Sequence, residues 1–342
     1  MPANAQRDTV GMQITALSGG IGGARFLRGL RRVVGQDDEL TVIGNTADDI
    51  WLFGLKICPD LDTVMYTLGG GIDDERGWGR VDETWRVKDE LAAYGVEPTW
   101  FGLGDRDFAT HIVRSQMLSA GYPLSAVTRA LCARWLPDAD RPAVRLLPMS
   151  DDRVETHIVV DDASEPSGRR AIHFQEYWVR LHAEPPVRDV VVVGVDEAVA
   201  APGVVDAILE ADAVILPPSN PIVSIGTILG VKDIAAAIRD TRAPVAGLSP
   251  IVEGSAVRGM ADQLLSGLGL ENSAAGVAEH YGGRRDGGYL DGWLVHDADG
   301  DLVPRIEDAG ISARAVPLLM RDPAATDAMA VATLDLVEEL RA

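Results

Sequence analysis

Short apolar runs alternate with amphipathic stretches in the first part of the chain. Residues 14–17 and 40–43 are apolar or β-branched, which is the composition and length of buried strands. Between them, five apolar residues recur at the spacing of one helix face: Phe26, Leu27, Leu30, Val33 and Val34. A strand, a helix and a second strand in this order predict a βαβ unit and favour a parallel sheet.

The same alternation returns in the C-terminal half. The run of valines in residues 190–195 is typical of a strand that is buried on both faces. A helix is expected at 202–210 and a last helix at 326–340. Further strands are expected at residues 213–216, 244–248, 292–296 and 313–318.

The middle of the chain follows a different pattern. Residues 82–94, 105–119 and 124–135 have helical character with short connections. Two alternating stretches, 154–160 and 171–179, flank a Glu-Pro-Ser-Gly turn at 165–168, which predicts a β-hairpin. We therefore expect an α/β fold with a mainly parallel sheet in a core of residues 12–61 and 186–342, a helical insert at 62–150 and a β-hairpin extension at 151–185.

Charge and composition narrow the possible partners. The net charge of −21 opposes binding to nucleic acid or to an anionic membrane, and no apolar run approaches the length of a membrane span. The first twelve residues lack the apolar stretch of a signal peptide. The two cysteines, Cys58 and Cys132, make no disulfide framework. We therefore expect a cytoplasmic protein with no nucleic-acid or membrane partner.

Polar turns follow four of the predicted strands directly. Their positions are Ser18-Gly19-Gly20, residues 45–49, Ser219-Asn220 and residues 249–250. Because the carboxyl ends of parallel strands lie on one edge of a sheet, where ligands bind at the crevice, we expect these turns to converge in space. This convergence defines the candidate site.

The first of these turns continues as a glycine loop, Gly19-Gly20-Ile21-Gly22-Gly23. Such a loop can hold phosphate through its backbone N–H groups; the alternative is a tight turn without a ligand. There is no GxxxxGK[ST] pattern, so a P-loop NTPase is disfavoured. Asn45 stands where an NAD-binding protein normally has an acidic residue for the ribose, so an NAD-dependent oxidoreductase is disfavoured too.

Two acidic turns follow the second strand, with Asp48 and Asp49 in one and Asp60 and Asp62 in the other. Carboxylates beside a phosphate repel it unless a hard cation lies between them, and oxygen ligands favour Mg²⁺. The alternative is helix capping and surface solvation, in which Asp62 caps a helix that starts at Thr63. The first reading predicts a metal-assisted reaction on a phosphorylated or nucleotide substrate.

Two other polar groups have two interpretations each. Asp107, His111 and Arg114 share one face of a predicted helix, either as a polar wall in which His111 or Arg114 meets an anion or as a solvated ion-pair stripe. Ser219 and Asn220 lie in a proline-bounded turn, either as contacts to a base or phosphate or as structural residues.

Nine ordered motifs resemble one known family, the 2-phospho-L-lactate transferases of coenzyme F-420 biosynthesis, over about residues 14–320. They are Ser18-Gly19-Gly20, Asn45-Thr46-Ala47-Asp48-Asp49, Cys58-Pro59-Asp60-Leu61-Asp62-Thr63-Val64, Leu103-Gly104-Asp105-Arg106-Asp107, Thr110-His111, Leu147-Pro148-Met149-Ser150-Asp151-Asp152, Ile172-His173-Phe174-Gln175-Glu176, Pro218-Ser219-Asn220-Pro221 and Ser249-Pro250-Ile251.

The resemblance implies a Rossmann-like core with a helical insert. It also implies a Mg²⁺-dependent reaction that joins the deazaflavin alcohol FO to a phosphorylated three-carbon acid carried on guanosine diphosphate, with release of GMP. The acid can be a lactate, enolpyruvate or glycerate form. The family pattern places Asp62 at the deazaflavin and metal site, and the glycine loop and Ser219-Asn220 near the guanosine diphosphate. Ile21 replaces the threonine of the Gly-Thr-Gly loop of some members, so a hydroxyl contact from that position is absent.

These arguments combine into one set of expectations. Asp62 and Asp48 are the candidate catalytic residues and Mg²⁺ ligands, and Tyr66, Trp78, Trp85 and Trp100 are expected to cover the flat ring of FO. We expect a homodimer. The alternative function is a nucleotide-sugar-binding regulatory protein of a related family. The candidate substrate-binding residues are Ser18, Gly19, Gly20, Gly22, Gly23, Asn45, Thr46, Asp49, His111, Arg114, Ser219 and Asn220.

Overall fold

Seven parallel strands form the centre of the computed structural model, which describes residues 11–137 and 142–342. Residues 1–10, most of the polar N-terminal segment, therefore lie outside the described residues. The strand order is β14-β13-β10-β9-β1-β2-β5. The bounds are β1 (Gln13–Ser18), β2 (Glu39–Gly44), β5 (Ala143–Pro148), β9 (Ala213–Leu216), β10 (Val245–Leu248), β13 (Gly292–His296) and β14 (Ser312–Val316).

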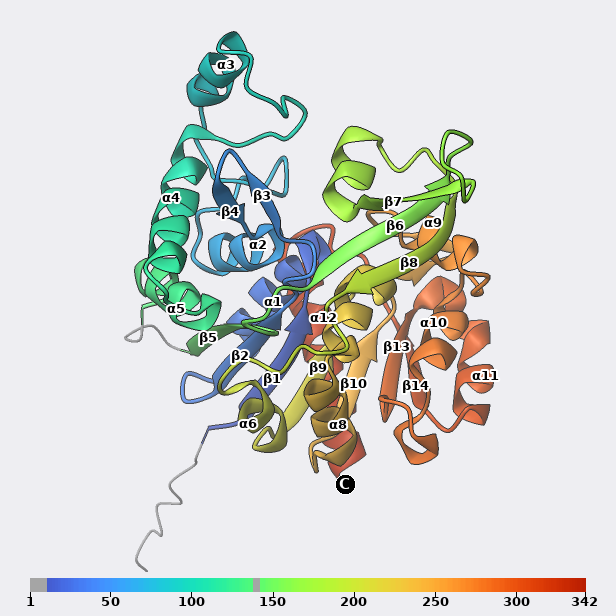
Figure 1. Ribbon diagram of the computed structural model, residues 1–342. Coiled ribbons are helices and arrows are strands. Elements are labelled where there is room, and N and C mark those ends of the chain that lie inside the picture. The colour runs from blue at the N-terminus through green and yellow to red at the C-terminus, as the bar shows by residue number, and fades with distance from the viewer. Residues whose placement is uncertain (1–10, 138–141) are drawn as a thin grey trace, which may run out of the picture.

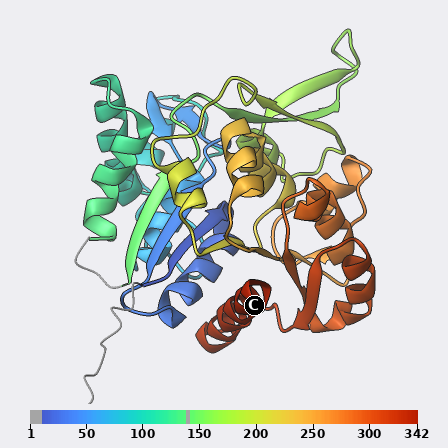
Figure 2. The same cartoon turned by 90° about the horizontal axis from the view of Figure 1, so that it is seen from below.

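Helices cover both faces of this sheet, which defines a Rossmann-like α/β fold (Figures 1 and 2). Successive strand residues enter opposite cores, because side chains alternate along a strand: Ala16 packs in one apolar cluster and Leu17 in the other. One cluster includes α1 (Gly20–Val33), α2 (Pro59–Leu68), α5 (Leu124–Trp135) and α12 (Pro323–Arg341). The other includes α6 (Val204–Leu209), α7 (Thr227–Gly230), α8 (Lys232–Asp240), α9 (Ala261–Gly267), α10 (Ala274–Tyr281) and α11 (Val303–Asp308).

Two structures rise above the carboxyl edge of the sheet (Figure 1). On one side lie α3 (Arg86–Ala93) and α4 (Asp105–Ser119) with the short hairpin of β3 (Ile50–Leu52) and β4 (Leu55–Ile57). On the other side is an antiparallel sheet of order β7-β6-β8, with the π-helix η1 between β7 and β8 in the chain. Their bounds are β6 (Glu155–Asp161), β7 (Arg169–His173), η1 (Glu176–Arg180) and β8 (Val187–Val193).

The remaining elements are short. The π-helix η2 (Pro221–Gly226) follows the turn after β9, and a two-stranded hairpin follows β10. That hairpin consists of β11 (Ile251–Val252) and β12 (Ser255–Ala256), and the 3₁₀-helices are η3 (Arg284–Asp286) and η4 (Asp297–Leu302). Among the described residues, no single helix is long and apolar enough to cross a membrane. One helix pair, Pro221–Gly230 with Lys232–Asp240, reaches that length and apolarity only when the two are taken together, and it is bent by 88°.

Several predicted elements are confirmed. The helices expected at 105–119 and 124–135 and the strand expected at 292–296 have the predicted bounds. Helix α1 begins earlier than the apolar pattern suggested, inside the glycine loop at Gly20, whose φ is +68°. Glycine reaches this φ without the steric penalty that a Cβ brings.

Three predictions about strands are wrong. The valine run was expected to be a doubly buried strand of the main sheet, but β8 pairs with β6 and exposes 42% of Val191 and 53% of Val193. The second hairpin strand ends at His173, and η1 follows where strand was expected up to 179. The edge strand β5 was expected to be part of a helical segment. Branched apolar residues fit half-buried and fully buried strands alike, so the run of valines alone does not select the sheet.

Candidate functional site

The turns after β1 and β9 meet where the strand order reverses. The chain continues from β1 to β2 on one side and from β9 to β10 on the other, which creates the crevice at which such sheets bind ligands. A Cβ on Gly22 would stand 2.6 Å from the Pro218 carbonyl oxygen, and one on Gly23 would stand 2.4 Å from Ser219 Oγ. Glycine at these positions therefore lets the two turns pack together.

Helix α1 presents an open N-terminus at this crevice. Its N-cap residue, Gly19, makes no side-chain capping hydrogen bond, and its first turn has no acidic residue. The Gly20 N–H donates to Asp60 Oδ1 at 2.8 Å, while the following amides of a first turn have no partner within the helix. A helix end of this kind attracts anions through its amides and its dipole.

A cavity of about 980 Å³ opens above the crevice. Its floor is the glycine loop and the turn after β9, and its walls come from the α2–α4 side and from the β7–η1 side. All four aromatic residues that we expected to cover a flat ring line it, together with Phe101, Phe174 and Trp178. The cavity thus joins an anion-attracting floor to an aromatic wall.

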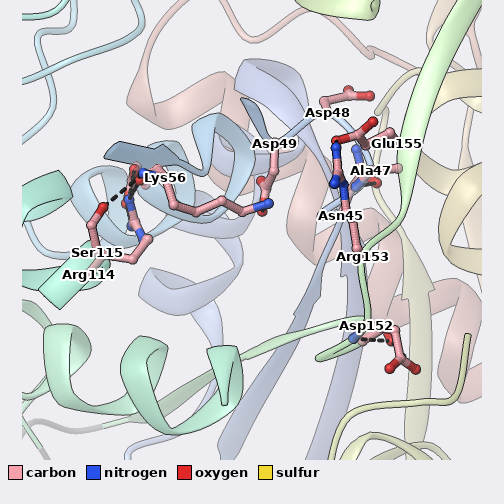
Figure 3. Close-up of polar contacts among 12 residues, drawn as sticks. Asn45, Ala47, Asp48, Asp49, Lys56, Arg114, Ser115, Asp152, Arg153 and Glu155 are labelled. Carbon is pink, nitrogen blue, oxygen red and sulfur yellow. Dashed lines mark hydrogen bonds and ion pairs between the residues drawn. The ribbon is translucent and has the colours of Figure 1, made fainter. Parts of the chain in front are cut away.

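The acidic turn after β2 directs its two carboxylates to different places (Figure 3). Asp49 Oδ2 lies 3.2 Å from the Lys56 ammonium and is screened from the cavity, whereas Asp48 lines the cavity. The turn is therefore divided into one paired and one available carboxylate.

The antiparallel sheet fixes the backbone of this turn through three consecutive carbonyl groups. The N–H of Thr156 donates to the Ala47 oxygen at 2.7 Å, and Gln175 Nε2 donates to the Asp48 oxygen at 3.1 Å. His173 Nε2 lies 3.2 Å from the Asp49 oxygen. Because His173 Nδ1 accepts the Gln175 N–H, the ring proton is on Nε2 and donates to Asp49. The direction of the Asp48 side chain is thus set by the sheet.

Asp48 and Asp60 are buried carboxylates, with 4% and 8% of their surface exposed. Burial and the neighbouring Asp60 raise the pKa of Asp48 well above its usual range, and burial raises the pKa of Asp60 to about 6. Asp60 accepts hydrogen bonds from Gly20 N and Asn45 Nδ2. Within residues 11–137 and 142–342, neither carboxylate has a basic side chain at ion-pair distance.

Asp62, by contrast, has a complete set of partners. It lies in the first turn of α2, whose N-cap is Cys58, so the alternative that Asp62 caps this helix is wrong. Arg114 donates to both of its oxygens, one at 3.0 Å. Arg114 Nη1 also lies 3.1 Å from His111 Nδ1, and since a guanidinium only donates, the His111 proton is on Nε2. That atom lies 3.6 Å from Asp107 Oδ2.

The network continues to the aromatic wall. The Tyr66 hydroxyl lies 2.7 Å from Asp107 Oδ1 and 2.8 Å from Thr110 Oγ1. Burial acts to raise the pKa of Asp107, but its contacts with His111, Tyr66 and Arg114 together outweigh burial and leave that pKa below its usual range. Asp62, His111, Asp107 and Tyr66 all line the cavity, so one buried polar network forms this part of its wall.

The donor set fits a magnesium ion that also binds substrate phosphates. Among the described residues, no group of three or more His, Cys, Asp or Glu side chains is arranged to hold a metal by itself. Asp48 lines the cavity, and its buried Oδ1 has no hydrogen-bond partner, so this carboxylate has coordination capacity left for a cation. Mg²⁺ commonly takes one or two protein carboxylates and completes its shell with water and phosphate oxygens.

The structure brings the predicted site residues together, some in the lining of the cavity and the others directly behind it. Cavity-lining residues are Gly19, Gly20, Gly22, Asp48, Asp62, His111, Ser219 and Asn220. Behind the lining lie Ser18, Gly23, Asn45, Thr46, Asp49 and Arg114. Asn45, for example, holds Asp60, the Val223 carbonyl oxygen and the Thr227 hydroxyl. Asn220 also caps η2 by accepting from Ile222 N and Val223 N.

Sequence reasoning missed several lining residues. Asp60 was recognised as part of an acidic turn but not as a site residue, although its spacing from Asp62 was the available signal. Phe174, Gln175 and Trp178 line the cavity because the chain leaves β7 early, and the alternating pattern gave no sign of that. Arg25 and Arg258 also line it, and no motif pointed to them.

Fold and cavity define an α/β protein with a ligand site at the carboxyl edge of a Rossmann-like sheet. The chain belongs to the family described as 2-phospho-L-lactate transferase CofD, whose model matches residues 14–317, and it is accordingly a transferase.

Relatives extend over nearly the whole chain. A phosphoenolpyruvate transferase of Streptomyces coelicolor is 62% identical over 330 residues, which cover 96% of this chain and 99% of that protein. A protein of the same name from Thermobifida fusca is 59% identical, with coverage of 96% and 99%. A solved Bacillus halodurans protein of the UPF0052 family has a TM-score of 0.61 at 15% identity, with coverage of 94% and 99%, which shows likeness of fold alone.

Proposed function

We propose that this transferase joins a phosphorylated three-carbon acid to the deazaflavin FO in the biosynthesis of coenzyme F-420. The donor is the guanosine-diphosphate conjugate of the acid. The terminal hydroxyl of FO forms a bond to the phosphorus that carries the acid, and the bond from that phosphorus to the bridging oxygen breaks. GMP leaves with the electron pair of that bond, the hydroxyl proton passes to a carboxylate, and the product is F-420-0 or its dehydro form.

The open end of α1 supports the placement of the nucleotide. Its amides, Ser219 and Asn220 form the floor of the cavity, where the diphosphate of the donor would lie. The first turn of α1 contains no acidic residue, and Asp60 occupies only the Gly20 N–H, so the following amides favour an anion. The relatives named phosphoenolpyruvate transferase make phosphoenolpyruvate the first acid to test.

The aromatic wall supports the placement of FO. Tyr66, Trp78, Trp85 and Trp100 lie on the α2–α4 side of the cavity, opposite Trp178 of η1. Flat heterocycles bind well between apolar ring faces with a few polar anchors. The ribityl chain of FO would then run from this wall toward the acidic turn.

Asp48 and Asp62 have different tasks in this proposal. Asp48, with its free buried oxygen, would hold Mg²⁺ together with the phosphates; Asp62, predicted as a second ligand, retains a lone pair on each oxygen beside its bonds to Arg114. When bound, Mg²⁺ supplies positive charge that offsets charge building up on the phosphate oxygens. Asp62, held in one orientation by Arg114, would orient the FO hydroxyl and accept its proton.

The proposal rests mainly on one observation: the open α1 end, the Asp48 carboxylate without a basic partner and the aromatic wall all lie in one cavity. The experiment is mass spectrometry of product formed from FO and guanosine-diphosphate conjugates of enolpyruvate, L-lactate and glycerate, with Mg²⁺ or EDTA. We expect a phosphodiester of FO and stoichiometric GMP, with Mg²⁺ only. Binding of UDP-sugar without any such product would favour the regulatory alternative.

A further inference from the structure

Two arginines reach the floor of the cavity from separate segments. Arg25 comes from α1, one turn after the glycine loop, and Arg258 comes from the loop between β12 and α9. Both line the cavity. In the part of the chain that the structure describes, neither is within ion-pair distance of a carboxylate. In a chain with a net charge of −21, two such cations in one cavity are a specific feature.

Backbone carbonyl groups of a single loop hold both guanidinium groups. Arg25 Nη2 donates to the Asp74 oxygen at 3.0 Å, and Arg258 Nη2 donates to the Arg76 oxygen at 3.2 Å. The nearby carboxylates are already used, because Asp74 pairs with Arg28 and Asp73 with Arg76. Each of the two arginines thus keeps further N–H donors for a ligand.

Both side chains lie near the open end of α1. Arg25 follows Ile21 by four residues, on the same helix face, and long helical side chains point back toward the N-terminus. A Cβ on Gly77 would lie 2.8 Å from Arg258 Nη2 and 3.2 Å from Ile21 Cγ2, so the Arg258 guanidinium also lies beside Ile21. The two cations therefore flank the position that the proposal gives to the donor phosphates.

Their proximity is unfavourable without an anion. Partial burial and the Arg25 charge lower the pKa of Arg258, as expected when like charges are held together. An anion between them would remove this repulsion. The fork of a guanidinium matches a carboxylate or a phosphate with two parallel N–H···O bonds, and the α1 amides already provide donors for the diphosphate.

We propose that Arg25 and Arg258 bind the carboxylate of the three-carbon acid and so distinguish the acid conjugate from plain GDP. This inference rests on the proposed function, and it assigns the diphosphate to the α1 amides and the carboxylate to the arginine pair. The pair is then the specificity element of the donor site for a 2-substituted carboxylic acid.

The test measures binding without FO, so it does not depend on transfer. Calorimetry compares GDP, the L-lactyl conjugate of GDP and the matching lactamide conjugate, in which a neutral amide replaces the carboxylate. Wild type should bind the lactyl conjugate about 10- to 100-fold more tightly than the lactamide, the range for a lost charged hydrogen bond. Arg25→Gln and Arg258→Gln should remove most of this preference and leave the Kd for GDP within about threefold.

Arg32→Gln is the matched control, because Arg32 lies on the same helix, outside the cavity lining, and pairs with the distant Asp327. It should keep the full preference, and thermal unfolding should show that all three variants are folded. If the arginine variants lose GDP binding and conjugate binding equally, the pair binds phosphate rather than the carboxylate. If they keep the preference for the lactyl over the lactamide conjugate, the pair does not contact the carboxylate. Either result overturns the inference. Normal preference without product from FO would instead contradict the proposed function alone.

Discussion

The cavity has two acidic regions, and they differ in how their charge is balanced. Asp62 is buried but receives both Nη groups of Arg114, which in turn contacts His111. Asp48 and Asp60 are just as buried, yet within the described residues neither has a cation at ion-pair distance, and the charge of Asp60 raises the pKa of Asp48. A buried carboxylate without a cation is costly. The charge of the first region is therefore balanced in the free protein, and we infer that a ligand balances the charge of the second.

We infer that the ion pair of the first region has a structural task, beside the catalytic role proposed for Asp62, and that the second region binds ligand. The Asp62–Arg114 pair joins α2 to α4 and thereby ties the helical side of the cavity to the core. In the second region, Asp60 links α2 to the glycine loop through Gly20 and to the acidic turn through Asn45. Changes in the two regions should consequently affect stability in opposite directions.

The largest effect on stability is expected for Arg114→Leu, because it leaves the buried Asp62 without a partner. Removing one member of a buried ion pair costs about 3–5 kcal/mol, so the free energy of unfolding in urea should fall by about this amount. The double variant Asp62→Asn/Arg114→Leu should recover part of the loss. Additive losses would mean that the pair is not energetically coupled.

Asp62→Asn should reduce the rate of transfer to FO by at least about 10²-fold, the usual scale for a charge removed at a reacting group. The variant should remain folded, since Asn is nearly isosteric and its Oδ1 can still accept from one Arg114 Nη group, but loss of the ion pair should lower its stability. Steady-state kinetics at saturating Mg²⁺ checks this. Near wild-type turnover would remove Asp62 from the catalytic set.

Asp48→Asn should have the opposite effect on the metal-free protein. It removes a carboxylate whose pKa is raised by burial and by Asp60, so in EDTA the free energy of unfolding at pH 7 should rise. Mg²⁺ with GDP at 100 times its Kd should stabilise wild type by about 2.7 kcal/mol and the variant far less. Destabilisation of the variant in EDTA would show that Asp48 is already balanced.

The pH dependence gives a smaller effect. The pKa of Asp60 is raised from 3.8 to about 6 in the folded protein, so between these values the folded state binds more protons than the unfolded state. The Asp60 contribution therefore lowers stability as pH rises from about 4 to 6, by on the order of 2 kcal/mol, and stays constant above.

Bound metal should instead increase stability as the pH rises, because it binds the ionised form of the carboxylates. Unfolding of wild type and Asp60→Asn in EDTA across this range, with and without Mg²⁺ and GDP, separates the two contributions. An identical pH slope for the two proteins would contradict the assignment to Asp60.

The sequence was sufficient for the parallel sheet and for the convergence of its turns, because apolar runs and strand-end turns are local signals. It was insufficient for β5 and β8, whose sheet is decided by tertiary pairing. The sequence also could not predict which carboxylates are paired with a basic side chain. The partner of Asp62 is Arg114, 52 positions away, and Asp49 rather than Asp48 receives Lys56; the spacing of four aspartates contains no information on this choice.

The most direct test of the account is cation binding by the Asp48 region. Electron paramagnetic resonance can count bound Mn²⁺, used in place of Mg²⁺, in the presence of GDP at pH 7.5. We predict one tightly bound ion in wild type and its loss in Asp48→Asn, while Lys56→Met, which changes only the paired neighbour of Asp49, retains it. Undiminished Mn²⁺ binding by Asp48→Asn would contradict the claim that this region is completed by a cation.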